Sequence, residues 1–90
     1  MKYKPARTGQ FKKDIKQMLL RGADVKELSE IMTKLTNGEK LESKHRDHKL
    51  AGNYIGRREC HIKSDWLLIY KIDGDCIIFE RSGTHADLFD

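Results

Sequence analysis

Trp66-Leu-Leu-Ile-Tyr-Lys-Ile-Asp-Gly-Asp-Cys-Ile-Ile-Phe-Glu-Arg81 is the stretch that decides the fold. Its two apolar runs are rich in aromatic and β-branched residues, which favour strands. Between them, Asp73-Gly74 suits the positive φ angles of a two-residue hairpin turn. The stretch therefore predicts two antiparallel strands, over 66–72 and 76–81.

A third strand is predicted just upstream, over 54–62, with a turn at Lys63-Ser64. If both turns have two residues, Trp66 faces Arg81 on one side and His61 on the other. These three side chains would then share one cross-strand row on one face of the sheet. One extra residue in either turn would move the side chains of the strand beyond it to the opposite face of the sheet.

Two helices are predicted before the strands. Thr8 is suited to cap a helix that ends at Gly22, and Asp24, with Glu27 three residues on, begins a second helix that stops at Asn37-Gly38. A short N-terminal strand precedes them, and a polar loop over 39–49 comes after them. The sequence predicts an α+β fold in a single domain over 1–90, with two N-terminal helices packed on an antiparallel β-sheet.

Composition limits the kind of partner. The chain has 90 residues, 18 of them basic and 14 acidic, and its net charge of +4 favours a polyanion. It lacks a secretory signal, and its longest apolar run is too short to span a bilayer, so we expect a cytoplasmic protein without a membrane partner. Cys60 and Cys76 fall inside predicted strands without C-x-x-C spacing, and we interpret both as reduced core residues.

All four histidines, His45, His48, His61 and His85, lie in the second half of the chain. Together with Asp65 and Arg81 they supply a proton acceptor, a proton donor and a fixed cation, which are the groups that phosphodiester cleavage needs. RNA brings its own nucleophile, the 2′-OH. The alternative is a zinc site made from His45-x-x-His48 and Cys60-His61. Neighbouring residues on a strand point to opposite faces, which argues against it.

Two segments, DHKLAGNYIGRRECHIKSDWLLIYK at 47–71 and FERSGTHADLF at 79–89, closely resemble the YafQ branch of the RelE-type toxins of bacterial toxin–antitoxin systems. The resemblance covers the whole chain. It implies the RelE-like microbial ribonuclease fold, with a short N-terminal strand and a three-stranded meander. One difference is Lys49, which stands where relatives often have proline.

The resemblance also implies a function. Such a toxin is a ribosome-dependent mRNA endoribonuclease that cuts the message in the ribosomal A site without metal or cofactor and so inhibits translation. Its partners would be mRNA, the 70S ribosome and a DinJ- or RelB-like antitoxin whose acidic segment wraps the toxin. The alternative is a non-catalytic basic module of the same fold that binds RNA or protein.

Residue roles are implied by the matching motifs. His48 and His61 would take part in proton transfer, and Asp65 would belong to the same catalytic group. Arg81 would stabilise the charge of the phosphorane, and His85 would be the general acid for the leaving 5′-oxygen.

Other matches are open to two interpretations. Phe89 would help to hold the substrate by stacking on a base. Trp66 is either a second substrate contact or, as we favour, a core residue, and Asp65 could simply close a turn. Lysines along the first helix could contact rRNA phosphates or form its solvated face: Lys12, Lys13 and Lys16. We assign His45 no role beyond that of a solvated loop residue.

The C-terminal segment is expected to form a wall of the site. Ser82-Gly83 would bend the chain after Arg81, and Leu88 and Phe89 would anchor the segment to the body of the domain. His85 would then reach the phosphate that Arg81 holds.

Overall fold

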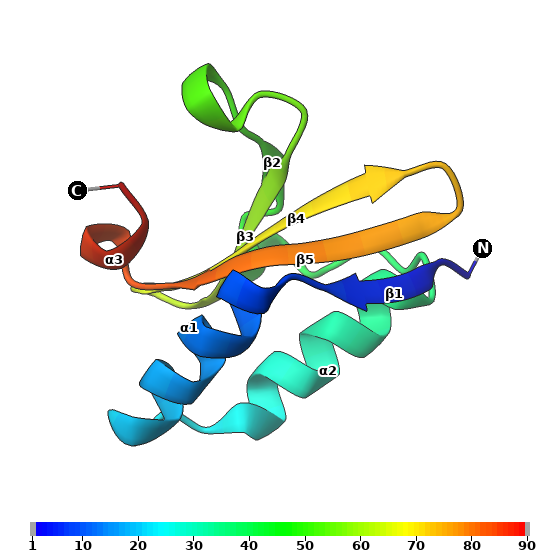
Figure 1. The fold of residues 1–90 in the computed structure, drawn as a ribbon. Coiled ribbons are helices and arrows are strands. Elements are labelled where there is room, and N and C mark those ends of the chain that lie inside the picture. Colours follow the sequence, from blue (N-terminus) through cyan, green and yellow to red (C-terminus); the bar gives the residue numbers. More distant parts are fainter. Residues whose placement is uncertain (1, 90) are drawn as a thin grey trace.

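The computed structural model describes residues 2–89 and has an α+β fold (Figure 1). The elements are β1 (Lys4–Arg7), α1 (Gly9–Leu20), α2 (Val25–Thr36), the short 3-10 helix η1 (Ser43–His45), β2 (His48–Lys49), the 3-10 helix η2 (Gly52–Tyr54), β3 (Arg58–Lys63), β4 (Trp66–Asp73), β5 (Cys76–Gly83) and α3 (His85–Phe89). The strands form one sheet in the order β1-β5-β4-β3-β2. Helices α1 and α2 cover one face of it, which confirms the predicted fold class. No helix within 2–89 is long and apolar enough to cross a membrane.

The two long helices begin at the predicted caps. The Thr8 hydroxyl accepts a hydrogen bond from the Phe11 backbone N–H, and the Asp24 carboxylate accepts one from Lys26. Each bond satisfies an N–H that the first helical turn leaves free. Gly22 and Gly38 lie just beyond the helix ends with φ angles of 87° and 75°, a conformation that glycine adopts without strain.

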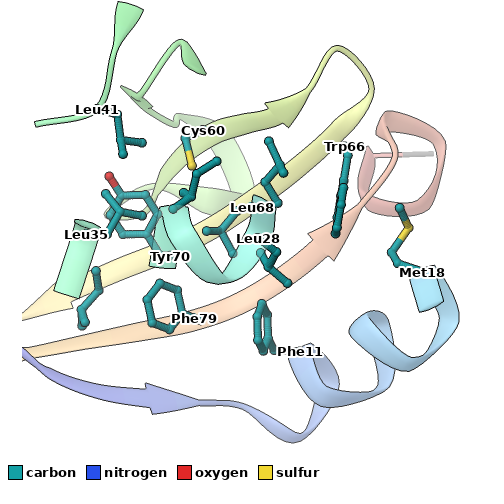
Figure 2. Close-up of a cluster of buried hydrophobic side chains, with 13 residues drawn as sticks. Phe11, Met18, Leu28, Leu35, Leu41, Cys60, Trp66, Leu68, Tyr70 and Phe79 are labelled. Carbon is teal, nitrogen blue, oxygen red and sulfur yellow. The ribbon is translucent and has the colours of Figure 1, made fainter. Parts of the chain in front are cut away.

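The main core fills the space between these helices and the sheet (Figure 2). Phe11 from α1 packs on Phe79 from β5, with ring centroids 6.0 Å apart. A smaller cluster lies on the other face, where Leu67, Ile69 and Leu88 are buried together. The sheet therefore has one face that the helices cover and one that is only partly covered.

Strand β1 runs parallel to β5, so the sheet is mixed, whereas the prediction was an antiparallel sheet. Its pairing ends at Arg7 with Phe79. There the chain turns into α1, and the Thr8 hydroxyl donates to the Glu80 carbonyl at 2.9 Å. Strand β1 pairs with one edge of β5 as far as Phe79. From Glu80 onward, that edge of β5 faces α1.

The predicted register is wrong at two places in the β4–β5 hairpin. Asp73 pairs with Cys76, so the turn residues are Gly74-Asp75 and not Asp73-Gly74. Further along, the register shifts by one residue, which leaves Glu80 as a bulge and pairs Arg81 with Ile69.

A second irregularity lies between His61 and Lys63 and pairs His61 with Leu67. His61 and Arg81 consequently share the partly covered face. Trp66 points to the other face, where it is 4% exposed, so the predicted row of three residues does not form. In this position Trp66 cannot stack on a base.

Three local predictions also need correction. The strand expected over 54–62 begins only at Arg58, because η2 precedes it. The loop expected over 39–49 contains η1 and the short strand β2, which pairs with β3. Cys60 is fully buried as predicted, but Cys76 is only half-buried because it opens β5 beside the hairpin turn.

Candidate active site

The predicted site residues project from the partly covered face of the sheet in two neighbouring cross-strand rows. One row contains His61, Leu67 and Gly83, and the other contains Glu59, Ile69 and Arg81. His48 of β2 pairs with Glu59 and extends the second row. Neighbouring strands lie about 4.8 Å apart, so these rows bring together side chains from β2, β3 and β5.

The histidine rings form a series across this face. The centroid of His61 lies 6.5 Å from that of His48 and 5.9 Å from that of His85. His61 is 12% exposed, whereas His48 and His85 are 48% and 57% exposed. The middle imidazole is therefore sheltered, while the outer two meet solvent.

Glu59 lies beneath two of these rings and was not recognised from the sequence. One carboxylate oxygen, Oε1, lies 3.4 Å from His48 Nε2 and 3.7 Å from His61 Nε2. The other, Oε2, is buried without a hydrogen-bond partner among the described residues. A buried carboxylate is costly unless donors or cations face it, and the imidazoles of His48 and His61 are the groups that face Glu59.

Asp65 holds His85 in place. Its Oδ1 accepts hydrogen bonds from the His85 backbone N–H and from His85 Nδ1, each at 3.0 Å. These bonds lower the pKa of Asp65 below its ordinary value, the backbone bond most of all. Since Nδ1 points to Asp65, Nε2 is the nitrogen of His85 that remains for proton transfer.

Arg81 is fixed by Asp14 of α1, a residue that no motif in the sequence singles out. Arg81 Nε and Nη2 donate to the two oxygens of Asp14 at 2.8 and 3.3 Å. The same carboxylate accepts from the Ser82 backbone N–H, on the edge of β5 that β1 leaves open. The bonds to Asp14 raise the pKa of Arg81, so the guanidinium stays charged, with Nη1 directed away from Asp14.

The last helix, α3, carries His85 and Phe89 and was expected only as an anchored segment. Thr84 and Asp87 cap it reciprocally: the Thr84 N–H donates to the Asp87 carboxylate, and the Asp87 N–H donates to the Thr84 hydroxyl. The pattern Thr-x-x-Asp in the sequence could have predicted this helix start. Leu88 is buried as predicted, whereas Phe89 is 44% exposed and packs only partly against the domain.

Gly83 allows α3 to fold back against β5. A Cβ atom at position 83 would lie 2.9 Å from the Cβ of Asp87. We expect Gly83→Ala to displace α3 and to destabilise the protein by about 1–3 kcal/mol, as overpacking does. Urea unfolding measures the effect.

The matched control is Gly9→Ala. A Cβ there meets nothing within 4 Å, and the position lies in the first turn of α1. This variant should keep the stability of the parent. Equal unfolding midpoints for both variants would contradict the proposed steric role of Gly83.

Phe89 lies beside the histidine series. Its ring centroid is 6.0 Å from that of His85 and 5.5 Å from that of Tyr54, which meets it edge to face. The Tyr54 hydroxyl also donates to the Leu88 carbonyl. Phe89 thus presents an exposed aromatic surface at one end of the site.

The remaining predicted residues lie outside this cluster. Trp66 donates its indole N–H to the buried Ser82 hydroxyl on the helix-covered face. His45 is not simply solvated, because its Nδ1 donates to the His61 carbonyl at 2.8 Å and so supports β3. The three lysines of α1 are all exposed, and helical geometry turns Lys12 and Lys16 away from Asp14.

A hollow of about 600 Å³ borders His61 on the side of α2. Basic and acidic side chains both line it, among them Lys34, Arg46 and Glu30. His61 borders this hollow, whereas His48 and His85 do not.

Comparison with known proteins identifies the family. The sequence model of a family described as "Bacterial toxin of type II toxin-antitoxin system, YafQ" matches residues 3–90. The chain belongs to the YafQ toxin family. The mRNA interferase toxin YafQ of Escherichia coli K12 is 42% identical over 83 residues, which cover 91% of this chain and 90% of that protein.

Solved YafQ structures share the whole fold. YafQ from E. coli BL21(DE3) matches with a TM-score of 0.94 at 38% identity, over 99% of this chain and 100% of that chain. The E. coli DinJ-YafQ toxin–antitoxin complex contains a chain that matches with a TM-score of 0.92 at 38% identity, over the full length of both. As a member of the YafQ family, the chain is an mRNA interferase toxin, that is, an endoribonuclease.

Proposed function

We propose that this toxin cuts messenger RNA in the A site of translating ribosomes by acid–base transesterification and thereby arrests translation. The observation that carries the proposal is that a carboxylate faces every reactive group of the site. Glu59 faces His48 and His61, Asp65 binds His85, and Asp14 binds Arg81. Such pairing orients a base, an acid and a cation before the substrate arrives.

The reaction proceeds from these roles. An imidazole of the His48–His61 pair accepts the proton of the ribose 2′-OH, and the resulting oxygen attacks phosphorus. The bond from phosphorus to the 5′-oxygen breaks, and His85 Nε2 donates its proton to that leaving oxygen. The products are a 2′,3′-cyclic phosphate, which can hydrolyse to a 3′-phosphate, and a free 5′-hydroxyl.

Arg81 and Phe89 position the substrate in this scheme. Arg81 directs Nη1 toward the phosphate while Asp14 holds the rest of the guanidinium, so the cation is in place when charge builds on the phosphorane oxygens. Phe89 stacks on a base next to the scissile phosphate. Trp66 has no part in substrate binding here, because it is buried.

The ribosome supplies the enclosure that the site lacks. The outer histidines are about half exposed on an open sheet face, so the protein alone offers a single strand of RNA little enclosure. A ribosome holds the message in one place, and the net charge of +4 favours docking among rRNA phosphates. The exposed lysines Lys12, Lys13 and Lys16 of α1 are candidates for those contacts.

The same charge supports an antitoxin partner. We propose a DinJ- or RelB-like protein with an acidic segment that wraps the toxin and covers the partly covered sheet face. E. coli YafQ has been solved in complex with DinJ. An acidic reading frame next to the gene is expected.

Primer extension on a defined message tests the proposed function. With the toxin and active translation, we expect new 5′ ends within codons, and we expect none on the same message without ribosomes. A parallel reaction keeps the ribosomal magnesium buffered and adds excess EDTA. Full cleavage is expected there, because the scheme needs only side chains and the 2′-OH.

Three results would count against the proposal. Cleavage of the naked message at the same rate would remove the ribosome from the mechanism. Loss of cleavage in EDTA on intact ribosomes would favour metal chemistry. Binding to ribosomes without any cleavage would favour the non-catalytic binding module.

A further inference from the structure

Helix α3 has only five residues, His85–Phe89, and a helix of that length has no stability of its own. Its position must come from contacts with the rest of the fold. One of these contacts is made by Arg21, the C-cap residue that directly follows α1. Arg21 Nη1 and Nη2 donate to the two carboxylate oxygens of Asp87 at 2.6 and 3.1 Å.

We call the ion pair between Arg21 and Asp87 the clamp. The same helix, α1, carries Asp14, which holds Arg81. Asp14 and Arg21 are seven residues apart, which is two helical turns, so both lie on one side of α1. Asp14 fixes Arg81 near the end of β5, and Arg21 fixes the helix that comes after β5. One rigid helix thus sets the positions of two elements of the site.

We propose that Arg21 is a positioning residue for His85, which it orients through the clamp on Asp87 and α3. The proposal rests on the proposed function, in which His85 is the general acid. Neither Arg21 nor Asp87 is assigned a place in the reaction itself.

The geometry separates this role from direct RNA binding. Both terminal nitrogens of Arg21 are bound to Asp87, and a planar guanidinium bound in this way is held in one orientation. Arg21 also lowers the pKa of Asp87 far below its ordinary value, an effect that the Thr84 N–H reinforces. A lowered pKa means that the clamp stabilises the fold at any pH above the ordinary carboxyl range and weakens only as acid protonates Asp87. The clamp therefore stays closed at neutral pH.

Other contacts limit the expected effect of losing the clamp. Leu88 is buried, the Tyr54 hydroxyl donates to its carbonyl, and Asp65 binds the backbone of His85. Without Arg21, α3 should keep its contacts with the sheet but shift by up to about 1 Å. Because a misplacement of that size costs up to about 10²-fold, we expect Arg21→Ala to lower kcat about 10-fold.

The experiment compares five proteins: the parent, Arg21→Ala, Asp87→Ala, the double variant and Lys4→Ala. Lys4→Ala is the matched control, because it also removes a cation from an exposed ion pair, with Asp75, at the far end of β5. Single-turnover cleavage on programmed ribosomes gives the rate at saturation and the concentration dependence. NMR titration of the Asp65 carboxyl reports on α3 independently of activity, since the His85 N–H lowers that pKa.

The clamp predicts a lower rate at saturation for Arg21→Ala, an unchanged KM, and an Asp65 pKa that rises toward its ordinary value. It also predicts that Arg21→Ala adds little in the Asp87→Ala background, because both changes break the same interaction. Lys4→Ala should match the parent in all three measurements.

A raised KM with an unchanged rate, or a full effect of Arg21→Ala in the Asp87→Ala background, would mean that Arg21 contacts RNA and would overturn the proposal. So would a parent-like rate together with an unchanged Asp65 titration. If the parent itself fails to cut, the proposed function fails, while the Asp65 titration still decides whether Arg21 holds α3.

Discussion

Replacing His85 by alanine is expected to lower the single-turnover rate of RNA cleavage by about 10²–10⁴, the contribution of a general acid. Stability should hardly change, because the side chain is 57% exposed and its bond to Asp65 lies at the surface. The backbone N–H of residue 85 can still bind Asp65. The measurement is cleavage of a message on programmed ribosomes, with urea unfolding as the check on folding.

A modified message makes this test specific for the acid. If sulfur replaces the 5′-oxygen at the scissile phosphate, the leaving group departs without a proton. His85→Ala should then cut the modified message nearly as fast as the parent does. A defect of equal size on both messages would show that His85 does not act as the general acid.

Replacing Arg81 by alanine is expected to lower the rate by about 10²–10³, the usual effect of removing one donor that faces developing negative charge. It should also destabilise the protein by about 1–3 kcal/mol, because Asp14, only 6% exposed, would lose its cation. Sulfur at the 5′ position should not rescue this variant, since the missing group does not serve the leaving oxygen.

A double variant separates the two effects. Arg81→Ala combined with Asp14→Asn has no orphaned buried charge, and the amide oxygen introduced at position 14 can still accept from the Ser82 N–H. We expect this double variant to recover most of the lost stability and none of the lost rate. A well-folded double variant that cuts like the parent would remove Arg81 from the mechanism.

Local signals in the sequence predicted the local structure well. Thr8 and Asp24 cap their helices as expected, because an N-cap depends on only a few neighbouring residues. The hydrophobic runs placed β4 and β5 to within two residues. The family motifs named residues that the fold does bring together, His48, His61 and His85 among them.

The strand register and the residues that hold the site in place could not be predicted from the sequence. The bulge at Glu80 forms where Thr8 and α1 meet the edge of β5, and no pattern within β5 indicates it. This bulge helps to place Arg81 on the opposite face from Trp66, against the prediction. Glu59, Asp14 and Arg21 look like ordinary surface charges until the chain folds, because their partners come from other elements.

Arg81 and Asp14 are separated by 67 residues, and Asp87 and Arg21 by 66. Closing such long loops is slow relative to forming a hairpin, so α1 is expected to dock late in folding. In a chain in which only the hairpins of β3, β4 and β5 had formed, Asp14 would not yet hold Arg81, and Arg21 would not yet hold α3. Late docking of α1 would therefore complete the site last, and local opening of α1 would remove the support of both Arg81 and α3.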